Sequence, residues 1–136
     1  MKNQKIMAII KSDQDEYLLL RTNPDWLKVD IWFIVTGSVE KEDKSEKDAV
    51  KREVEEETGL EIMDIEKTDY VSEYEWPRDS GKHYTERAYV VKVKQTIPRL
   101  SGEHLESKWL DKETFIDKIY WEGDKKELNK ILDLNI

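Results

Sequence analysis

The most constraining feature of this chain is a helix whose expected buried face carries acidic side chains. Ser45 is a favourable N-cap residue, and Asp48 follows it at the capping-box position. Gly59 is a favourable residue just beyond a helix C-terminus. The sequence therefore predicts a helix that begins after Ser45 and ends near Thr58.

Three glutamates of this helix fall on or beside its apolar arc. Successive helical residues turn by roughly 100°. This spacing places Glu53 and Glu57 inside the arc and Glu56 at its edge. The arc itself is defined by the apolar residues Ala49, Val50 and Val54.

Burying these carboxylates unpaired would cost several kcal/mol, so positive charge must meet them. Arg52 precedes the first glutamate but cannot neutralise all three. A hard divalent cation that prefers oxygen ligands solves the problem, and Mg²⁺ or Mn²⁺ fits best. The alternative is that the segment is one turn of a solvated acidic helix, since runs of charged residues are usually exposed.

The composition describes a small acidic domain. The 136 residues are 38% hydrophobic and 40% charged, and 31 acidic against 23 basic residues give a net charge of -8. Such a chain repels nucleic-acid polymers, and it would repel a free polyphosphate unless a cation intervened. Cysteine is absent, so disulfides and Cys-ligated zinc are excluded. We find no signal peptide or membrane span, and we expect a soluble cytoplasmic protein.

Patterning along the chain predicts a single domain of mixed α/β (α+β) class over 1–136. Hydrophobic periodicity and turn residues, Asn23-Pro24-Asp25 among them, separate strands from helices. The predicted strands are 6–10, 17–21, 31–35, 62–74, 85–93 and 107–110, and two further helices are predicted at 112–119 and 124–134.

The segment from about 37 to 60 resembles the Nudix box, G-x5-E-x7-R-E-U-x-E-E-x-G-U, in which U is aliphatic. Every defined position from Arg52 to Leu60 matches. The front half departs, because the expected glutamate falls on Lys44 and the expected glycine on Ser38. Anchored on Gly37 instead, the loop is one residue longer, and Asp43 could replace the missing acid.

The resemblance implies the Nudix fold, an α/β/α sandwich around a mixed β-sheet. It also implies hydrolysis of a nucleoside diphosphate linked to another group, with Mg²⁺ or Mn²⁺ as cofactor. By position Glu53, Glu56 and Glu57 look like metal ligands, and Arg52 like the residue that orients them.

Two outer motifs are similar to a branch of the family that acts on dihydroneopterin triphosphate and dATP. They are the stretch from Trp32 to Glu40 and the stretch from Glu103 to Asp111. The similarity implies that Glu103 is a fourth metal-binding acid and a candidate general base. It also implies a substrate-binding set, which consists of Arg21, Thr36, Gly37 and Trp121.

The sequence thus predicts a Mg²⁺-dependent pyrophosphohydrolase that acts on a nucleoside or pterin triphosphate, as a monomer or homodimer. A diadenosine polyphosphate hydrolase, or another Nudix hydrolase that acts on nucleotide sugars or NTPs, is the second possibility. The charged loop Lys41–Lys44 and the basic residues Lys82 and Arg87 could meet a longer phosphate chain. A Nudix-fold ligand-binding module without catalysis is the third.

Overall fold

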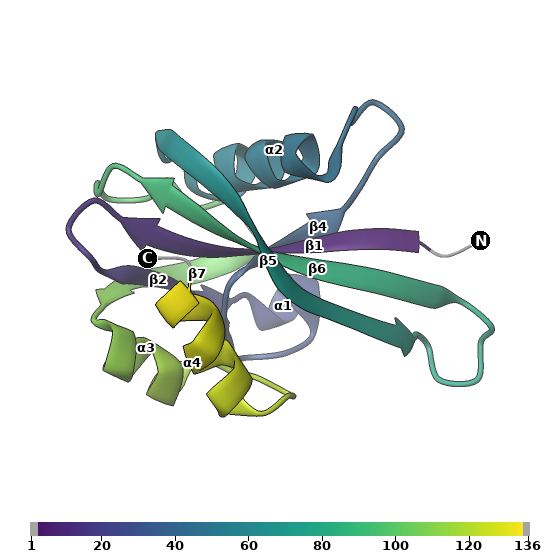
Figure 1. The fold of residues 1–136 in the computed structure, drawn as a ribbon. Coiled ribbons are helices and arrows are strands. Elements are labelled where there is room, and N and C mark those ends of the chain that lie inside the picture. The colour runs from purple at the N-terminus through teal and green to yellow at the C-terminus, as the bar shows by residue number, and fades with distance from the viewer. Residues whose placement is uncertain (1–2, 135–136) are drawn as a thin grey trace.

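The computed structural model describes residues 3–134, which form three layers (Figure 1). A mixed sheet lies in the middle, with helix α2 on one face and helices α3 and α4 on the other. The strands are β1 (Asn3–Ser12), β2 (Tyr17–Thr22), β3 (Trp32–Phe33), β4 (Val35–Ser38), β5 (Ile62–Glu75), β6 (His83–Val93) and β7 (His104–Leu110). The helices are α1 (Pro24–Leu27), α2 (Glu46–Thr58), α3 (Lys112–Lys118) and α4 (Lys125–Leu134).

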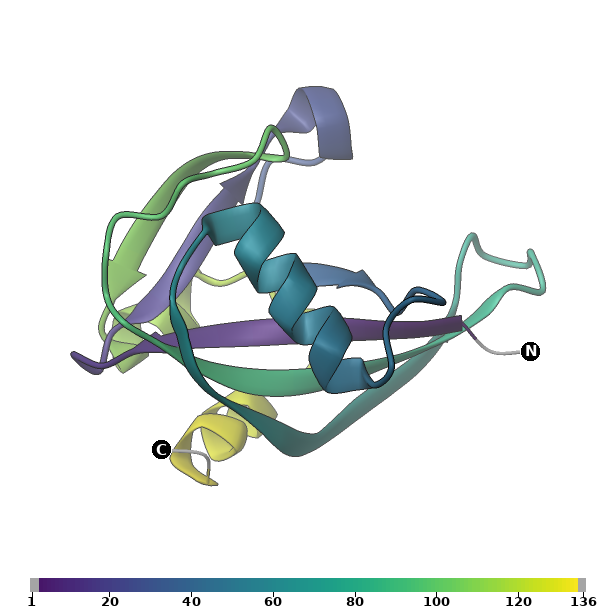
Figure 2. The ribbon, with the colours of Figure 1, turned by 90° about the horizontal axis from the view of Figure 1, so that it is seen from above.

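The sheet is built around β1, which is buried from Ile6 to Ser12. β1 pairs in parallel with β6 over its whole length, and β6 pairs with β5 in an antiparallel hairpin. β1 meets β2 only at the hairpin pair Lys11↔Tyr17, because β4 occupies its edge from Lys5 to Ala8. β2 therefore turns away from β1 and pairs with β3 and β7, and Figure 2 shows β2 and β7 rising from the rest of the sheet.

Helix α2 forms where the caps predict it and lies across the first face of the sheet (Figure 2). The Ser45 hydroxyl accepts a hydrogen bond from the Asp48 amide, and Gly59 ends the helix in the left-handed conformation. The fully buried Val50 and Val54 pack on apolar side chains of β1, β2 and β6. At the N-terminal end of α2, Glu46 accepts hydrogen bonds from Arg87 and Tyr89 of β6. These bonds anchor the helix to the sheet.

The opposite face of the sheet is covered by α3 and α4. Phe115 of α3 and Leu128 of α4 are fully buried and belong to one apolar cluster with Ile9 and Leu19 of the sheet. The longest described helix, α2, has 13 residues. None of the helices within residues 3–134 is both long and apolar enough to cross a bilayer.

The single-domain α/β (α+β) fold, the mixed sheet and the α/β/α layering are as predicted, but three local predictions differ from the structure. The strand predicted at 31–35 is two short strands, because β3 pairs with β2 while β4 pairs with β1. The break predicted at Asn23 starts helix α1, since the Asn23 side chain caps it and Pro24 occupies its first turn. The strand predicted at 107–110 begins earlier, at His104.

The apolar cluster beneath α3 and α4 allows a prediction about truncating a side chain of α4. Replacing the fully buried Leu128 by alanine should lower the free energy of unfolding by about 2 to 5 kcal/mol, because a cavity adds to the lost burial. Urea denaturation measures the change. Leu105→Ala is the matched control, since Leu105 is 48% exposed and its truncation should cost no more than about 0.5 kcal/mol. Equal losses in the two variants would contradict this packing.

Candidate functional site

The buried carboxylate of Glu57 lies where the last turn of α2 meets the loop before β7. Its Oε2 atom accepts a hydrogen bond from the Ser101 hydroxyl at 2.6 Å and lies 3.0 Å from Nδ1 of His104. Glu103 completes the group. Ligand atoms of Glu57, Glu103 and His104 all lie within 4.8 Å of one another.

The loop that carries this group is held on two sides. On the α2 side, the Arg99 amide donates to the Thr58 carbonyl at 2.8 Å. On the α1 side, the Asn23 amide donates to the Glu103 carbonyl at 2.8 Å, and the Asn23 side chain donates to the Gly102 carbonyl at 2.9 Å. These bonds place Glu103 beside Glu57 although the two residues are far apart in sequence.

The acids of this group shift one another's pKa in opposite directions. Burial raises the pKa of Glu57, but the contacts with His104 and Ser101 outweigh burial and hold it below its ordinary value. Burial raises the pKa of Glu103, and the neighbouring negative charge of Glu57 raises it further. The pKa of Glu57 is therefore lowered and that of Glu103 raised, and carboxyl groups whose pKa values are pushed apart in this way are common at functional sites.

Arg52 is the centre of a network one turn earlier on α2. Its guanidinium donates two hydrogen bonds to Asp43, at 3.2 and 2.9 Å, and one to the Ser38 carbonyl at 2.9 Å. It also donates to Glu53 at 2.7 Å. Arg52 therefore joins the loop before the helix to the first of the three glutamates, and Asp43 is the loop acid that pairs with it.

Glu53 packs directly against the glycine of β4. A Cβ atom at Gly37 would lie 2.3 Å from Cδ of Glu53, so a larger residue there would displace the Glu53 side chain. Burial raises the pKa of Glu53 and the bond from Arg52 opposes the shift. Glu56 is different, because its side chain is 57% exposed and lies 3.7 Å from Arg52. The predicted placement of Glu53 and Glu57 on the buried arc and of Glu56 at its edge is confirmed.

The donor set at Glu57 suits a divalent cation. The group offers two carboxylates, and His104 Nδ1 is buried without a well-aligned hydrogen-bond partner among residues 3–134. Carboxylate oxygens and an imidazole nitrogen are both groups that bind divalent metal ions in proteins. Glu53 and Glu56 lie on the same side of α2, close enough for their charges to act on this group. The residues therefore fit a metal ion.

A cleft of about 640 Å³ opens on the opposite face of the sheet. Its walls are largely aromatic, and Trp121 packs on Tyr70 with ring centroids 5.3 Å apart. Nε1 of Trp121 is buried and, among the described residues, has no hydrogen-bond partner. Thr36 also lines the cleft, next in sequence to the glycine that contacts Glu53. The aromatic residues that line it are Phe33, Tyr70, Tyr74, Trp76, Tyr120 and Trp121.

Arg21 lies outside both groups and its guanidinium is already paired. It donates to both carboxylate oxygens of Asp30, at 2.9 and 3.0 Å, and to Glu106 at 2.8 Å. These bonds raise the pKa of Arg21 above its ordinary value. Arg21 would have to release a carboxylate before binding a phosphate.

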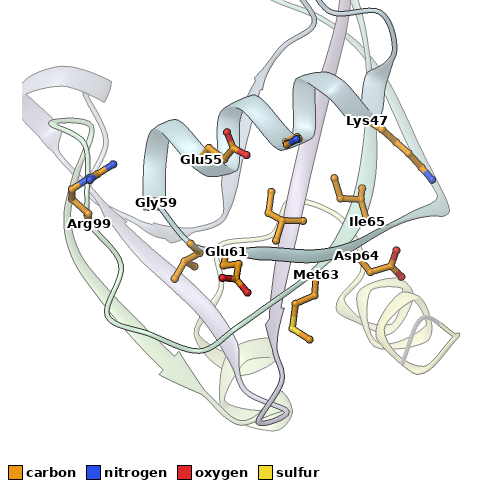
Figure 3. Close-up of a pocket in the computed structure, with 11 residues that line it drawn as sticks. Lys47, Glu55, Gly59, Glu61, Met63, Asp64, Ile65 and Arg99 are labelled. Carbon is orange, nitrogen blue, oxygen red and sulfur yellow. The ribbon is translucent and has the colours of Figure 1, made fainter.

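A second depression, of about 770 Å³, runs along the outer side of α2 (Figure 3). Lys47 and Glu55 of α2, Asp64 of β5 and Arg99 line it with charges of both signs. None of the predicted site residues lines this groove, and it offers no convergent set of ligands.

Sequence reasoning missed Ser101 and His104. The sequence contains only two histidines, His83 and His104, whose scattered positions make a weak case for zinc, yet the ring of His104 lies beside Glu57. The available signal was its position next to Glu103, in a segment already assigned to the site. Nothing in the sequence pointed to Ser101.

Comparisons with known proteins bear on this geometry. Residues 1–130 match the family model described as the NUDIX domain. The structure is similar to the Escherichia coli dihydroneopterin triphosphate pyrophosphohydrolase, with 21% identity, a TM-score of 0.73, and 96% of this chain and 95% of that chain covered. It is also similar to a MutT protein from Methanosarcina mazei Go1, with 24% identity, a TM-score of 0.72, and 98% and 95% covered.

A third similar structure is the NUDIX domain of Shewanella oneidensis NrtR complexed with ADP ribose. The identity is 16% and the TM-score 0.73, and the alignment covers 98% of this chain and 88% of that chain. A search of curated proteins gives no match. At these identities the structural similarities establish the fold.

The Arg52 network predicts a pH-dependent contribution of Asp43 to stability. The bonds from Arg52 and the Glu40 amide hold the pKa of Asp43 below its ordinary value of 3.8. The stabilisation is therefore fully present above that value and is lost as the pH falls through the lowered pKa of the folded state. Asp43→Asn should lower the free energy of unfolding at pH 7 and the difference should shrink in acid.

Urea denaturation of both proteins from pH 7 to pH 3 measures this difference. Asp69→Asn is the control, since Asp69 is exposed on β5 and its substitution should change stability little at any pH. A deficit for Asp43→Asn that stays constant down to pH 3 would show that the ion pair is not its source.

Proposed function

The chain belongs to the NUDIX family of hydrolases, which act on phosphoric anhydrides, and we propose that it is a Mg²⁺-dependent pyrophosphohydrolase. Its substrate is a nucleoside or pterin triphosphate, which it converts to the monophosphate and pyrophosphate. The observation that carries the proposal is the group of Glu57, Glu103 and His104 at the end of α2, one helical turn from Glu53. Mn²⁺ is the alternative cofactor.

In this proposal Glu53, Glu56, Glu57 and Glu103 hold the cation. When bound, the cation neutralises phosphate oxygens and lowers the pKa of a water molecule. Arg52 positions Glu53 through the 2.7 Å hydrogen bond and keeps the loop from Ser38 to Asp43 in place. In this proposal Arg52 is thus a positioning residue, which acts through Glu53 and the loop rather than on the substrate.

Glu103 is the candidate general base of the proposal. It is half-buried beside Glu57, and its pKa is raised toward the range in which a carboxylate accepts protons efficiently. It would take a proton from the attacking water. The oxygen of that water bonds to phosphorus while the phosphoric anhydride bond breaks, and pyrophosphate leaves.

The aromatic cleft holds the ring of the substrate. Trp121 and Tyr70 offer flat faces on which a purine or pterin stacks. Thr36 and Gly37 are adjacent on β4 and face opposite sides of the sheet, so they connect the cleft to Glu53. Arg21 can bind a substrate phosphate only if its guanidinium first releases the carboxylate of Asp30 or Glu106.

A dinucleoside polyphosphate hydrolase is the second candidate, favoured by Trp26. This indole is 63% exposed and packs on Gly102, next to Glu103 in the chain. It offers a second stacking surface beside the acids. Arg87 does not support this candidate, since it is paired with Glu46. A cytoplasmic location and a monomeric or homodimeric state remain predictions.

Replacing Glu57 by glutamine tests the proposed centre. With Mg²⁺ and a triphosphate substrate, Glu57→Gln should release pyrophosphate at least about 100-fold more slowly than the wild type, because a buried ligand loses its charge. Glu55→Gln is the matched control, since Glu55 is exposed on the far side of the same helix and its variant should keep the wild-type rate. Equal rates for wild type and Glu57→Gln would overturn the proposal.

A substrate panel separates the two candidates. Dihydroneopterin triphosphate, dATP and diadenosine tetraphosphate are compared at equal concentration with Mg²⁺. The proposal expects pyrophosphate from a triphosphate as the fastest reaction. Preferential cleavage of diadenosine tetraphosphate, weakened by Trp26→Ala, would favour the second candidate instead. Metal-dependent binding without turnover of any compound would indicate a non-catalytic module.

A further inference from the structure

The floor of the aromatic cleft contains an acid that the proposed reaction does not use. On one face of the sheet, Glu86 of β6 lies between Lys5 of β1 and Ser72 of β5 in a cross-strand row. The adjacent row on the same face contains Thr36 and Met7. All five residues line the cleft, so Glu86 lies near its centre.

The carboxylate of Glu86 has no direct partner among the residues that the structure describes. No hydrogen bond or ion pair within residues 3–134 satisfies it, and its neighbour Lys5 lies instead over the ring of Tyr84, 5.6 Å from the centroid. Burial raises the pKa of Glu86, Lys5 lowers it and Glu122 raises it. A ring that fills the cleft removes water from this half-buried carboxylate, and that cost is offset only where the ring supplies donors.

The aromatic walls and the Glu86 carboxylate together favour a ligand with a flat ring that carries adjacent N–H donors. A carboxylate has two acceptor oxygens side by side and binds best to two parallel N–H groups. The ring N–H and exocyclic amino group of guanine form such an edge, and the 2-amino-4-oxo ring of a pterin forms the same one. Adenine instead presents one amino group beside a ring nitrogen lone pair, which a carboxylate repels.

We infer that Glu86 is a specificity-determining residue that selects 2-amino-4-oxo rings, guanine or pterin, over adenine. The inference rests on the proposed function for the phosphate end of the substrate, but it makes a separate claim about the ring end. The two oxygens of Glu86 accept the paired donors while the ring stacks against Trp121 and Tyr70.

The test compares bases and the variant Glu86→Gln. Wild type should hydrolyse GTP with a kcat/KM at least about tenfold above that for ITP, which lacks the amino group, and above that for ATP. Because the amide of glutamine can pair with adenine, Glu86→Gln should lower the GTP to ATP ratio by about tenfold or more. Glu66→Gln, an exposed acid of β5 outside the cleft, should keep the wild-type ratio.

Binding without turnover separates this inference from the proposed function. Tryptophan fluorescence titrations with GMP, IMP and AMP need no metal and no catalysis. A preference for GMP that Glu86→Gln abolishes supports the inference even if no triphosphate is hydrolysed, an outcome that would overturn the proposed function alone. Equal binding of all three by wild type would overturn the inference, whether or not the variant folds.

Discussion

The structure depends on one electrostatic constraint, the burial of carboxylates on the sheet-facing side of α2. Glu57 is 6% exposed, and its neighbour Glu53 packs against the backbone of β4. Removing these charges from water is unfavourable unless positive charge or donors replace it. Arg52 meets Glu53, while Ser101 and His104 meet Glu57. The loops that supply these partners are held where the acids need them.

The same constraint explains how the two ends of the site are connected. Gly37 lets Glu53 approach β4 from the α2 side, and Thr36, its neighbour, faces the cleft on the other side. This stretch of β4 also occupies the edge of β1 and forces β2 to diverge. The short strand β4 therefore contacts Glu53, lines the cleft and separates β2 from β1.

Local signals predicted α2 well, whereas long-range pairing limited the rest. The caps Ser45 and Gly59 and the helical spacing of the glutamates are local, so both the helix and its buried arc followed from sequence. The division of the predicted strand at 31–35 depends on which strand each half pairs with. Ser101 lies 44 residues from Glu57. Glu86 had a usable signal, because it shares one face of its strand with the buried residues Ala88 and Val90.

The acidity of the chain has opposite consequences at the two ends of the ligand. Among the 22 residues from Glu40 to Glu61, 10 are acidic and 5 basic, which accounts for 5 of the 8 net negative charges. In this segment the acids converge, and a bound cation can offset their repulsion of a phosphate group. In the cleft Glu86 stands apart from them and its neighbour Lys5 does not neutralise it directly. That carboxylate must be satisfied by N–H donors, and a ring without them leaves it desolvated and unpaired. Selection at this end therefore works through the penalty on the wrong ring as much as through attraction for the right one.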